Sequence, residues 1–211
     1  MICLTAVARR TAIRAVAAAT LLAASVAACS PSSADRTTTG NTVATEAPQT
    51  TTTNPYAVPA VIDAAYVNRV LAGLDAVVGD VTRTVVRTKT VPPEDFDRLR
   101  AVYGTNELLQ LIIDSVQSDL RRGLLGYRLE PGNRVSTVEK ILSATPRCVF
   151  AQVRRDYQAV SVNPNTVNPQ WVGIQPGDAN RDPAGYNSTQ WSLIYDGFSQ
   201  DRSMPTNPCA V

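Results

Sequence analysis

The hydrophobic pattern of the chain changes from a helical period to a strand period near Gly132. Between residues 62 and 86, apolar side chains recur every three or four positions, which is the spacing of one face of an amphipathic helix. These positions are Ile62, Tyr66, Val70, Leu74, Val77, Val81 and Val85. Pro59 precedes the segment and fits the start of a helix. The pattern therefore predicts one long helix.

Two shorter helices are predicted before the period changes. Pro92-Pro93 breaks the chain, and residues 94–103 follow with acids in the first turn, where the helix macrodipole favours them. A third helix begins with Thr105 or Asn106 as N-cap and ends at residues 121–123, Arg-Arg-Gly, which is typical of a helix C-terminus. Its apolar face consists of Leu108, Leu109, Ile112, Ile113, Val116 and Leu120.

Four strands are predicted after Gly132, because apolar and polar residues then alternate. They cover residues 135–143, 148–157, 171–175 and 190–198, and the segments 163–169 and 176–189 are predicted as a turn and a long loop. In the last strand, Trp191, Leu193 and Tyr195 alternate with Ser192, Ile194 and Asp196. Helices followed by consecutive strands indicate an α+β domain, with three N-terminal helices packed on an antiparallel sheet of about four strands.

The first residues are typical of an exported protein. Three arginines without an acid precede an apolar run at residues 15–28, which is too short to span a bilayer and predicts a signal peptide. The stretch Val26-Ala27-Ala28-Cys29 resembles a bacterial lipobox, which implies acylation of Cys29 and cleavage just before it. We then expect the protein to be anchored to the outer face of the cell membrane by this lipid. A plain secreted protein with a chance cysteine is the alternative.

The segment after Cys29 is unsuited to folding. More than half of residues 30–59 are Thr, Ser or Pro, and large apolar side chains are almost absent. We expect residues 29–59 to consist of the acylated cysteine and a disordered linker. Residues 60–211 are then long enough for a single domain with one core.

Charge and cysteine usage narrow the function classes. Removing residues 1–28 takes three arginines and no acids from 20 basic and 18 acidic residues, which leaves 17 against 18. A near-neutral chain lacks the basic footprint of nucleic-acid binding. Cys148 and Cys209 are the two cysteines left after export and acylation, so we expect a disulfide between them. Since there is no CxxC motif and no histidine, we expect no metal and no cofactor.

Four short segments carry a resemblance to known proteins. Residues 66–71 (YVNRVL), 98–103 (RLRAVY), 154–157 (RRDY) and 207–209 (NPC) resemble a group of actinobacterial, mycobacterial-type lipoproteins of uncharacterised function. The order of helices and strands resembles the NTF2-like (cystatin-like cone) superfamily. This resemblance implies a sheet that curls around the long helix and leaves a conical pocket.

The resemblance also suggests candidate pocket residues. Some relatives use a His-Asp pair for catalysis, and this mechanism is excluded here because the chain has no histidine. Isomerase relatives use an Asp base with Tyr and a protonated Asp, and Asp156, Tyr66, Tyr103 and Tyr157 are of these types. Aromatic pocket walls would come from Trp171, Trp191 and Tyr195. The alternatives are sheet packing for the aromatics, and for Asp156 a solvated ion pair with Arg154 or Arg155.

Two functions from different classes follow. The favoured one is a non-enzymatic cell-envelope module that docks a protein partner, or assembles with itself, through an exposed sheet face. The alternative is a binder, or an enzyme, for an apolar small molecule or envelope lipid in the pocket. An open, mostly apolar cavity with a buried carboxylate of raised pKa favours the alternative, whereas a filled cone and an apolar sheet face favour docking.

Overall fold

Three helices precede a four-stranded antiparallel sheet in the computed structural model, which describes residues 54–163, 167–197 and 203–210. The helices are α1 (Ala64–Thr88), α2 (Pro93–Val102) and α3 (Asn106–Arg121). The strands β1 (Val135–Thr145), β2 (Cys148–Asp156), β3 (Val167–Pro176) and β4 (Trp191–Gly197) pair in chain order, with a 3-10 turn η1 (Ala179–Arg181) before β4. The α+β class, with three helices and an antiparallel sheet, is confirmed.

Parts of the prediction need a qualification. The helices precede the sheet but begin at residue 64, not at the start of the chain. The predicted signal peptide, Cys29 and the linker up to residue 53 lie outside the described residues. The described residues belong to one compact unit that spans residues 50–211. Among them, no helix has both the length and the hydropathy to cross a membrane.

Local signals set the ends of the helices. Asp63, not Pro59, caps α1, because its carboxylate accepts a hydrogen bond from the Tyr66 amide at 2.7 Å. Of the two predicted caps of α3, Thr105 and not Asn106 takes this place, through a 3.2 Å hydrogen bond from the Leu108 amide. Gly123, also as predicted, follows the end of α3 with a φ of 70°, in the left-handed region that glycine adopts without strain.

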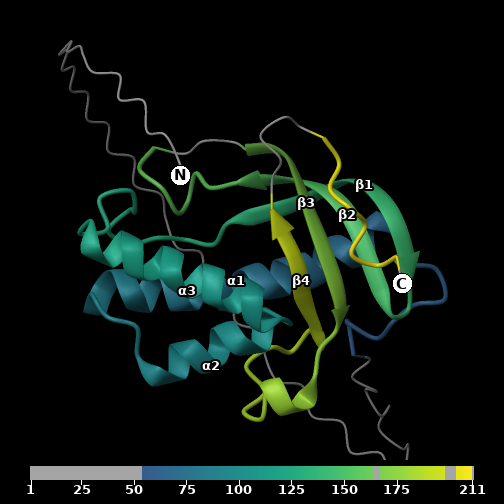
Figure 1. The fold of residues 1–211 in the computed structure, drawn as a ribbon, viewed down its shortest axis with the longest axis horizontal. Helices are drawn as coiled ribbons and strands as arrows, with labels where there is room; N and C mark the ends of the chain where they lie inside the picture. The colour runs from purple at the N-terminus through teal and green to yellow at the C-terminus, as the bar shows by residue number, and fades with distance from the viewer. Residues whose placement is uncertain (1–53, 164–166, 198–202, 211) are drawn as a thin grey trace, which may run out of the picture. The chain divides into compact units, whose positions relative to one another are not determined.

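The helices cover one face of the sheet, and the core lies between these layers (Figure 1). Alternate residues of β2 point into this core, as the sequence pattern predicts: Val149, Ala151 and Val153. They pack with Val172 and Ile174 of β3 and with the first half of α1. The register of the sheet shifts at several points, between β1 and β2, β2 and β3, and β3 and β4. Such irregularities bend a sheet and increase its twist.

The register shift in β4 reverses one prediction. Gly173 pairs with Tyr195 and the next residue, Ile174, pairs with Leu193, so Ile194 is an extra residue in β4. Leu193 lies in the core, and Asp196 also contacts side chains on that side of the sheet. The predicted alternation, which placed Leu193 and Asp196 on opposite faces, is therefore wrong because the bulge re-aims the side chains that follow it. Likewise, β3 begins at Val167, inside the segment predicted as a turn.

The opposite face of the sheet is partly covered by the C-terminal segment. The predicted disulfide between Cys148 and Cys209 is confirmed, with the two Cα atoms 5.6 Å apart. Pro208 then packs over β3, where a Cβ atom on Gly173 would lie 2.7 Å from the Pro208 ring. Phe150 is fully buried on this face, and its ring forms an edge contact with Tyr195 at 6.3 Å.

Candidate functional site

A cavity of about 520 Å³ lies among the helices, the segment that follows α3 and one end of the sheet. Its helical wall consists mainly of aliphatic side chains from α1, α2 and α3: Val78, Val81, Val85, Val86, Leu99, Ile112 and Val116. Its other walls include Tyr103, Leu124, Tyr127, Arg134, Tyr157, Val160 and Gln170. Small-molecule sites are typically about 300–1,000 Å³ and mostly apolar with a few polar groups. The cavity has this size and this composition.

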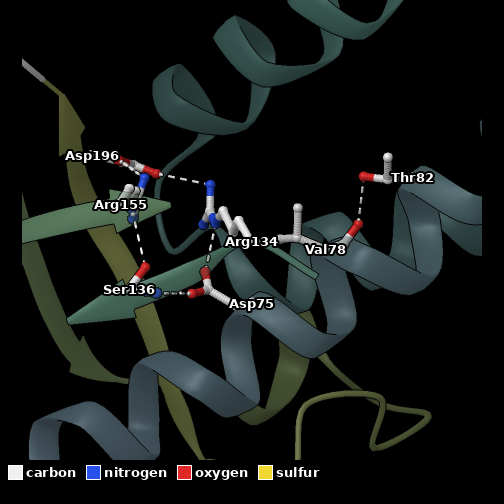
Figure 2. Close-up of polar contacts among 7 residues, drawn as sticks. All are labelled: Asp75, Val78, Thr82, Arg134, Ser136, Arg155 and Asp196. Carbon is white, nitrogen blue, oxygen red and sulfur yellow. Dashed lines mark hydrogen bonds and ion pairs between the residues drawn. The ribbon is translucent and has the colours of Figure 1, made fainter. Parts of the chain in front are cut away.

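Arg134, which immediately precedes β1, is the basic residue of the cavity wall. Its side chain is only 10% exposed. Nε donates to the Asp75 carboxylate on α1 at 2.5 Å, and Nη1 lies 3.7 Å from the Asp196 carboxylate on β4. Figure 2 shows the guanidinium between these two acids. The arginine therefore has a fixed position at the junction of helix and sheet.

Two further side chains close this arrangement into a ring, the ion network (Figure 2). Arg155 of β2 donates from Nη1 to Asp196 at 2.5 Å and from Nε to the Ser136 hydroxyl at 3.2 Å. The Ser136 amide in turn donates to Asp75 at 3.1 Å. The ion network thus connects α1, β1, β2 and β4, and its two arginines balance its two aspartates.

Mutual attraction keeps these buried groups ionised. Burial alone would raise the pKa of Asp196, but the charges of Arg155 and Arg134 outweigh burial and hold this pKa below its usual value. Burial alone would lower the pKa of Arg134, yet the neighbouring acids, Asp75 first, raise it well above its usual value. The cavity wall therefore carries a permanent guanidinium whose charge is already balanced.

Two buried polar atoms of the wall have no hydrogen-bond partner among the described residues. They are Nη2 of Arg134 and Oε1 of Gln170, both from residues that line the cavity. Leaving a buried donor or acceptor unpaired costs about 1–3 kcal/mol, so such atoms are uncommon in folded proteins. Nη2 is a donor and Oε1 is an acceptor, and both belong to residues of the cavity wall. Tyr103 lines the same cavity, and burial raises the pKa of its phenol, which stays protonated.

A second polar pair lines the cavity next to the end of α3. The Tyr127 hydroxyl donates to the Asp119 carboxylate at 2.9 Å, and Arg122 also binds this carboxylate. Burial and the neighbouring Asp119 carboxylate raise the pKa of Tyr127. The Asp119 carboxylate therefore has its hydrogen-bond donors within the protein.

Of the predicted pocket residues, Tyr103 and Tyr157 line this cavity. Tyr66 and Trp191 come together, but in the core: the Trp191 indole donates to the Tyr66 hydroxyl at 2.8 Å, and this hydroxyl donates to the Tyr56 carbonyl at 2.9 Å. The rings of Tyr66 and Trp191 form an edge contact with centroids 6.2 Å apart. For these two aromatics the alternative, packing with a polar partner, describes the contacts found.

The other candidates lie away from the cavity. Asp156 at the end of β2 is exposed, and its carboxylate accepts a hydrogen bond from the Gln158 amide at 2.7 Å. Trp171 pairs with Gln152 on the face of the sheet opposite the core, and Tyr195 packs against Phe150 on that face. The structure therefore does not assemble the predicted set of Asp156 with tyrosines and tryptophans.

The ion network was missed in the sequence, although two of its members left a signal. Asp75 directly follows Leu74 in the core-facing part of α1, where an acid needs a buried partner. Arg155 continues the inward alternation of Ala151 and Val153 along β2. Asp196 left no such signal, because the bulge at Ile194 decides which way it points.

Comparison with known proteins adds no family assignment. The chain matches no protein-family model, no curated protein and no solved structure. Within the described ranges, no three His, Cys, Asp or Glu side chains gather closely enough to hold a metal ion.

Proposed function

We propose that the domain binds one amphipathic small molecule in the cavity, as a receptor or carrier without catalysis. The observation that carries this proposal is the cavity of about 520 Å³, whose lining is mostly aliphatic and includes Arg134 and Gln170, each with a buried polar atom that has no partner among the described residues. The apolar body of the ligand would contact the valines of α1, and a group with both a donor and an acceptor would pair with the two polar atoms. Both atoms are covered, so we expect a small side-chain rotation to accompany binding.

Electrostatics support binding over proton transfer. One acid next to Arg134 is Asp196, whose pKa is held low by two arginines. A carboxylate of lowered pKa is a weak general base near neutral pH. Since the charges of the ion network cancel, a ligand with a neutral polar group, such as an alcohol or amide, suits the wall better than a strong anion or cation.

Docking of a protein through the sheet, the function favoured from the sequence, stays a prediction with less support. The face opposite the helices carries Pro208 over Gly173 and a fully buried Phe150. The middle of this face is therefore occupied by the protein's own C-terminal segment.

The membrane location and the fold family of the domain are also part of the proposal. The resemblance of residues 26–29 to a lipobox supports an exported protein held at the outer face of the membrane by a lipid anchor. A long helix against an irregular antiparallel sheet, with a cavity between them, supports the NTF2-like cone.

A cavity-filling substitution tests the binding function. Val116→Trp places an indole into the cavity, whereas Leu111→Trp places one on the exposed side of the same helix, where Leu111 is 63% exposed. The probe is N-phenyl-1-naphthylamine, a small apolar fluorophore with an N–H donor. We expect saturable, one-to-one binding to the parent chain and to Leu111→Trp, and at least a tenfold weaker affinity for Val116→Trp.

Near-ultraviolet circular dichroism checks that each variant is folded. Equal affinity of the folded Val116→Trp chain, or no saturable binding to the parent chain, would contradict the proposal. Native mass spectrometry of the chain exported from an actinobacterial host is the complementary measurement, because a stoichiometric co-purifying mass identifies the natural ligand.

A further inference from the structure

The segment from the last residue of α3 onward, residues 121–130, has two chemically different sides, and we call it the rim loop. Leu124 and Tyr127 point inward and line the cavity. Leu125 and Leu129 point outward, with 82% and 92% of their surface exposed, more than any other large apolar residue among those described. Side chains this exposed add little to the packing of the domain and are accessible to a partner surface.

The rim loop is also basic. Arg121, Arg122 and Arg128 are all exposed, but Arg122 pairs with Asp119 just before the loop and Glu130 is an exposed acid within it, so three arginines face two acids. Arginines that flank exposed leucines are typical of segments that lie at a membrane interface, since the leucines enter the acyl boundary and the cations contact anionic headgroups. Charge complementarity thus selects an anionic surface as the partner.

The backbone of the rim loop is already held in place. The Arg128 amide donates to the Val160 carbonyl at 3.0 Å, and the Val162 amide donates to the Gly126 carbonyl at 3.1 Å. The Ser161 hydroxyl donates to the same Gly126 carbonyl at 2.9 Å. These bonds tether the middle of the rim loop to the segment at residues 160–162.

We propose that the rim loop docks the domain onto an anionic lipid bilayer through Leu125, Leu129 and the flanking arginines. Since the other side of the loop is a wall of the cavity, this contact places the cavity next to the bilayer. The inference goes beyond the proposed function and does not require it, because the rim loop can bind a membrane whether or not the cavity holds a ligand.

Vesicle flotation tests the inference. The protein is the exported full chain carrying Cys29→Ser, so that no acyl chain contributes, and mass spectrometry confirms the same N-terminus in every variant. The vesicles contain phosphatidylcholine with or without phosphatidylglycerol. We expect the double variant Leu125→Ser/Leu129→Ser to partition at least tenfold less into the anionic vesicles than the parent chain, and the control Leu111→Ser, on an exposed helix position, to match the parent chain.

The charge dependence has its own variants. Arg121→Gln/Arg128→Gln should abolish the preference for vesicles that contain phosphatidylglycerol, whereas Arg147→Gln, an exposed arginine in the turn between β1 and β2, should preserve it. Equal partition of the double leucine variant and the parent chain would overturn the inference. Self-association that depends on the two leucines, without vesicle binding, would overturn it in favour of a second copy of the chain.

Failure of this inference is distinguishable from failure of the proposed function. The rim-loop substitutions change outward side chains only, so the affinity for N-phenyl-1-naphthylamine should stay within about twofold of the parent chain. A chain that binds the fluorophore but not vesicles keeps the ligand-binding function and loses the membrane contact.

Discussion

The two halves of α1 share one hydrophobic pattern and meet different surroundings. The first half places Val67, Val70 and Leu74 in a closely packed core with the sheet. The second half places Val81 and Val85, at the same helical spacing, in the same core cluster, but these two side chains also line the wall of a cavity. Asp75 of the ion network lies between the two halves. The difference lies in what faces the helix, apolar strands in one half and Arg134 with the rim loop in the other.

This contrast separates two roles within one core. Close packing gains dispersion contacts and removes apolar surface from water, so the first half stabilises the fold. Side chains around a cavity lack part of those contacts, so a cavity lowers stability and persists only where other interactions hold the fold together. The ion network stands at the boundary and fixes the strands that carry the polar wall. Four sets of measurements test this division, in order of decreasing expected effect.

Breaking the ion network should have the largest effect. Arg155→Met leaves Asp196 with one arginine, the more distant Arg134 at 3.7 Å. The site is buried, since the Arg155 side chain is 2% exposed. Removing one partner of a buried ion pair costs about 3–5 kcal/mol of the free energy of unfolding. Arg83→Met, which breaks an exposed pair with Asp80 on α1, should cost about 0–1 kcal/mol. Urea denaturation measures both free energies of unfolding. Equal losses would show that the ion network contributes no more to stability than an exposed ion pair.

A matched pair of valine truncations compares the two halves of α1 directly. Val70→Ala should destabilise by about 2–3 kcal/mol, since it removes buried methyl groups and creates a new void. Val85→Ala enlarges a cavity that already exists, so it should cost about 1 kcal/mol. Thermal and urea unfolding give the two values. If Val85→Ala proved as costly as Val70→Ala, the second half would be as tightly packed as the first.

Removing an unpaired polar atom should change stability in the opposite direction. Gln170→Leu deletes the buried acceptor without a partner, and the free energy of unfolding should rise by about 1 kcal/mol. The same change should weaken binding of ligands with an N–H or O–H donor, which is the trade expected of a residue kept for binding. A loss of stability would instead indicate that Gln170 is satisfied in the folded protein.

Acid should weaken the ion network. This effect is the smallest of the four, because Asp196 titrates well below neutral pH. The pKa of Asp196 is lower in the folded protein than in the unfolded chain, where it is about 3.9. The carboxylate therefore contributes its full stability above that value and loses it as the pH falls through the folded-state pKa. The free energy of unfolding, measured from about pH 7 to pH 3, should fall less steeply for Asp196→Asn than for the parent chain. A parallel pH profile would show that Asp196 does not titrate with unfolding.

Local patterns predicted most of the fold. The three helices follow from the spacing of apolar residues and from caps such as Thr105, and the strands follow from alternation, because these signals act within one turn or one strand. The pairing of Cys148 with Cys209 followed from counting the cysteines that would remain if the chain were exported and acylated at Cys29. These features depend on neighbours in sequence or on composition.

Contacts between distant segments set the remainder. Arg134 meets Asp75 across 59 residues, and Arg155 meets Asp196 across 41 residues, so neither pairing leaves a local pattern. A one-residue bulge at Ile194 turns Asp196 toward the cavity side, because a single inserted residue reverses a strand with period two. The cavity itself depends on how closely the layers approach. Residue order along the chain thus specifies the elements and their apolar faces, whereas packing between distant segments sets where these faces meet closely and where they leave space.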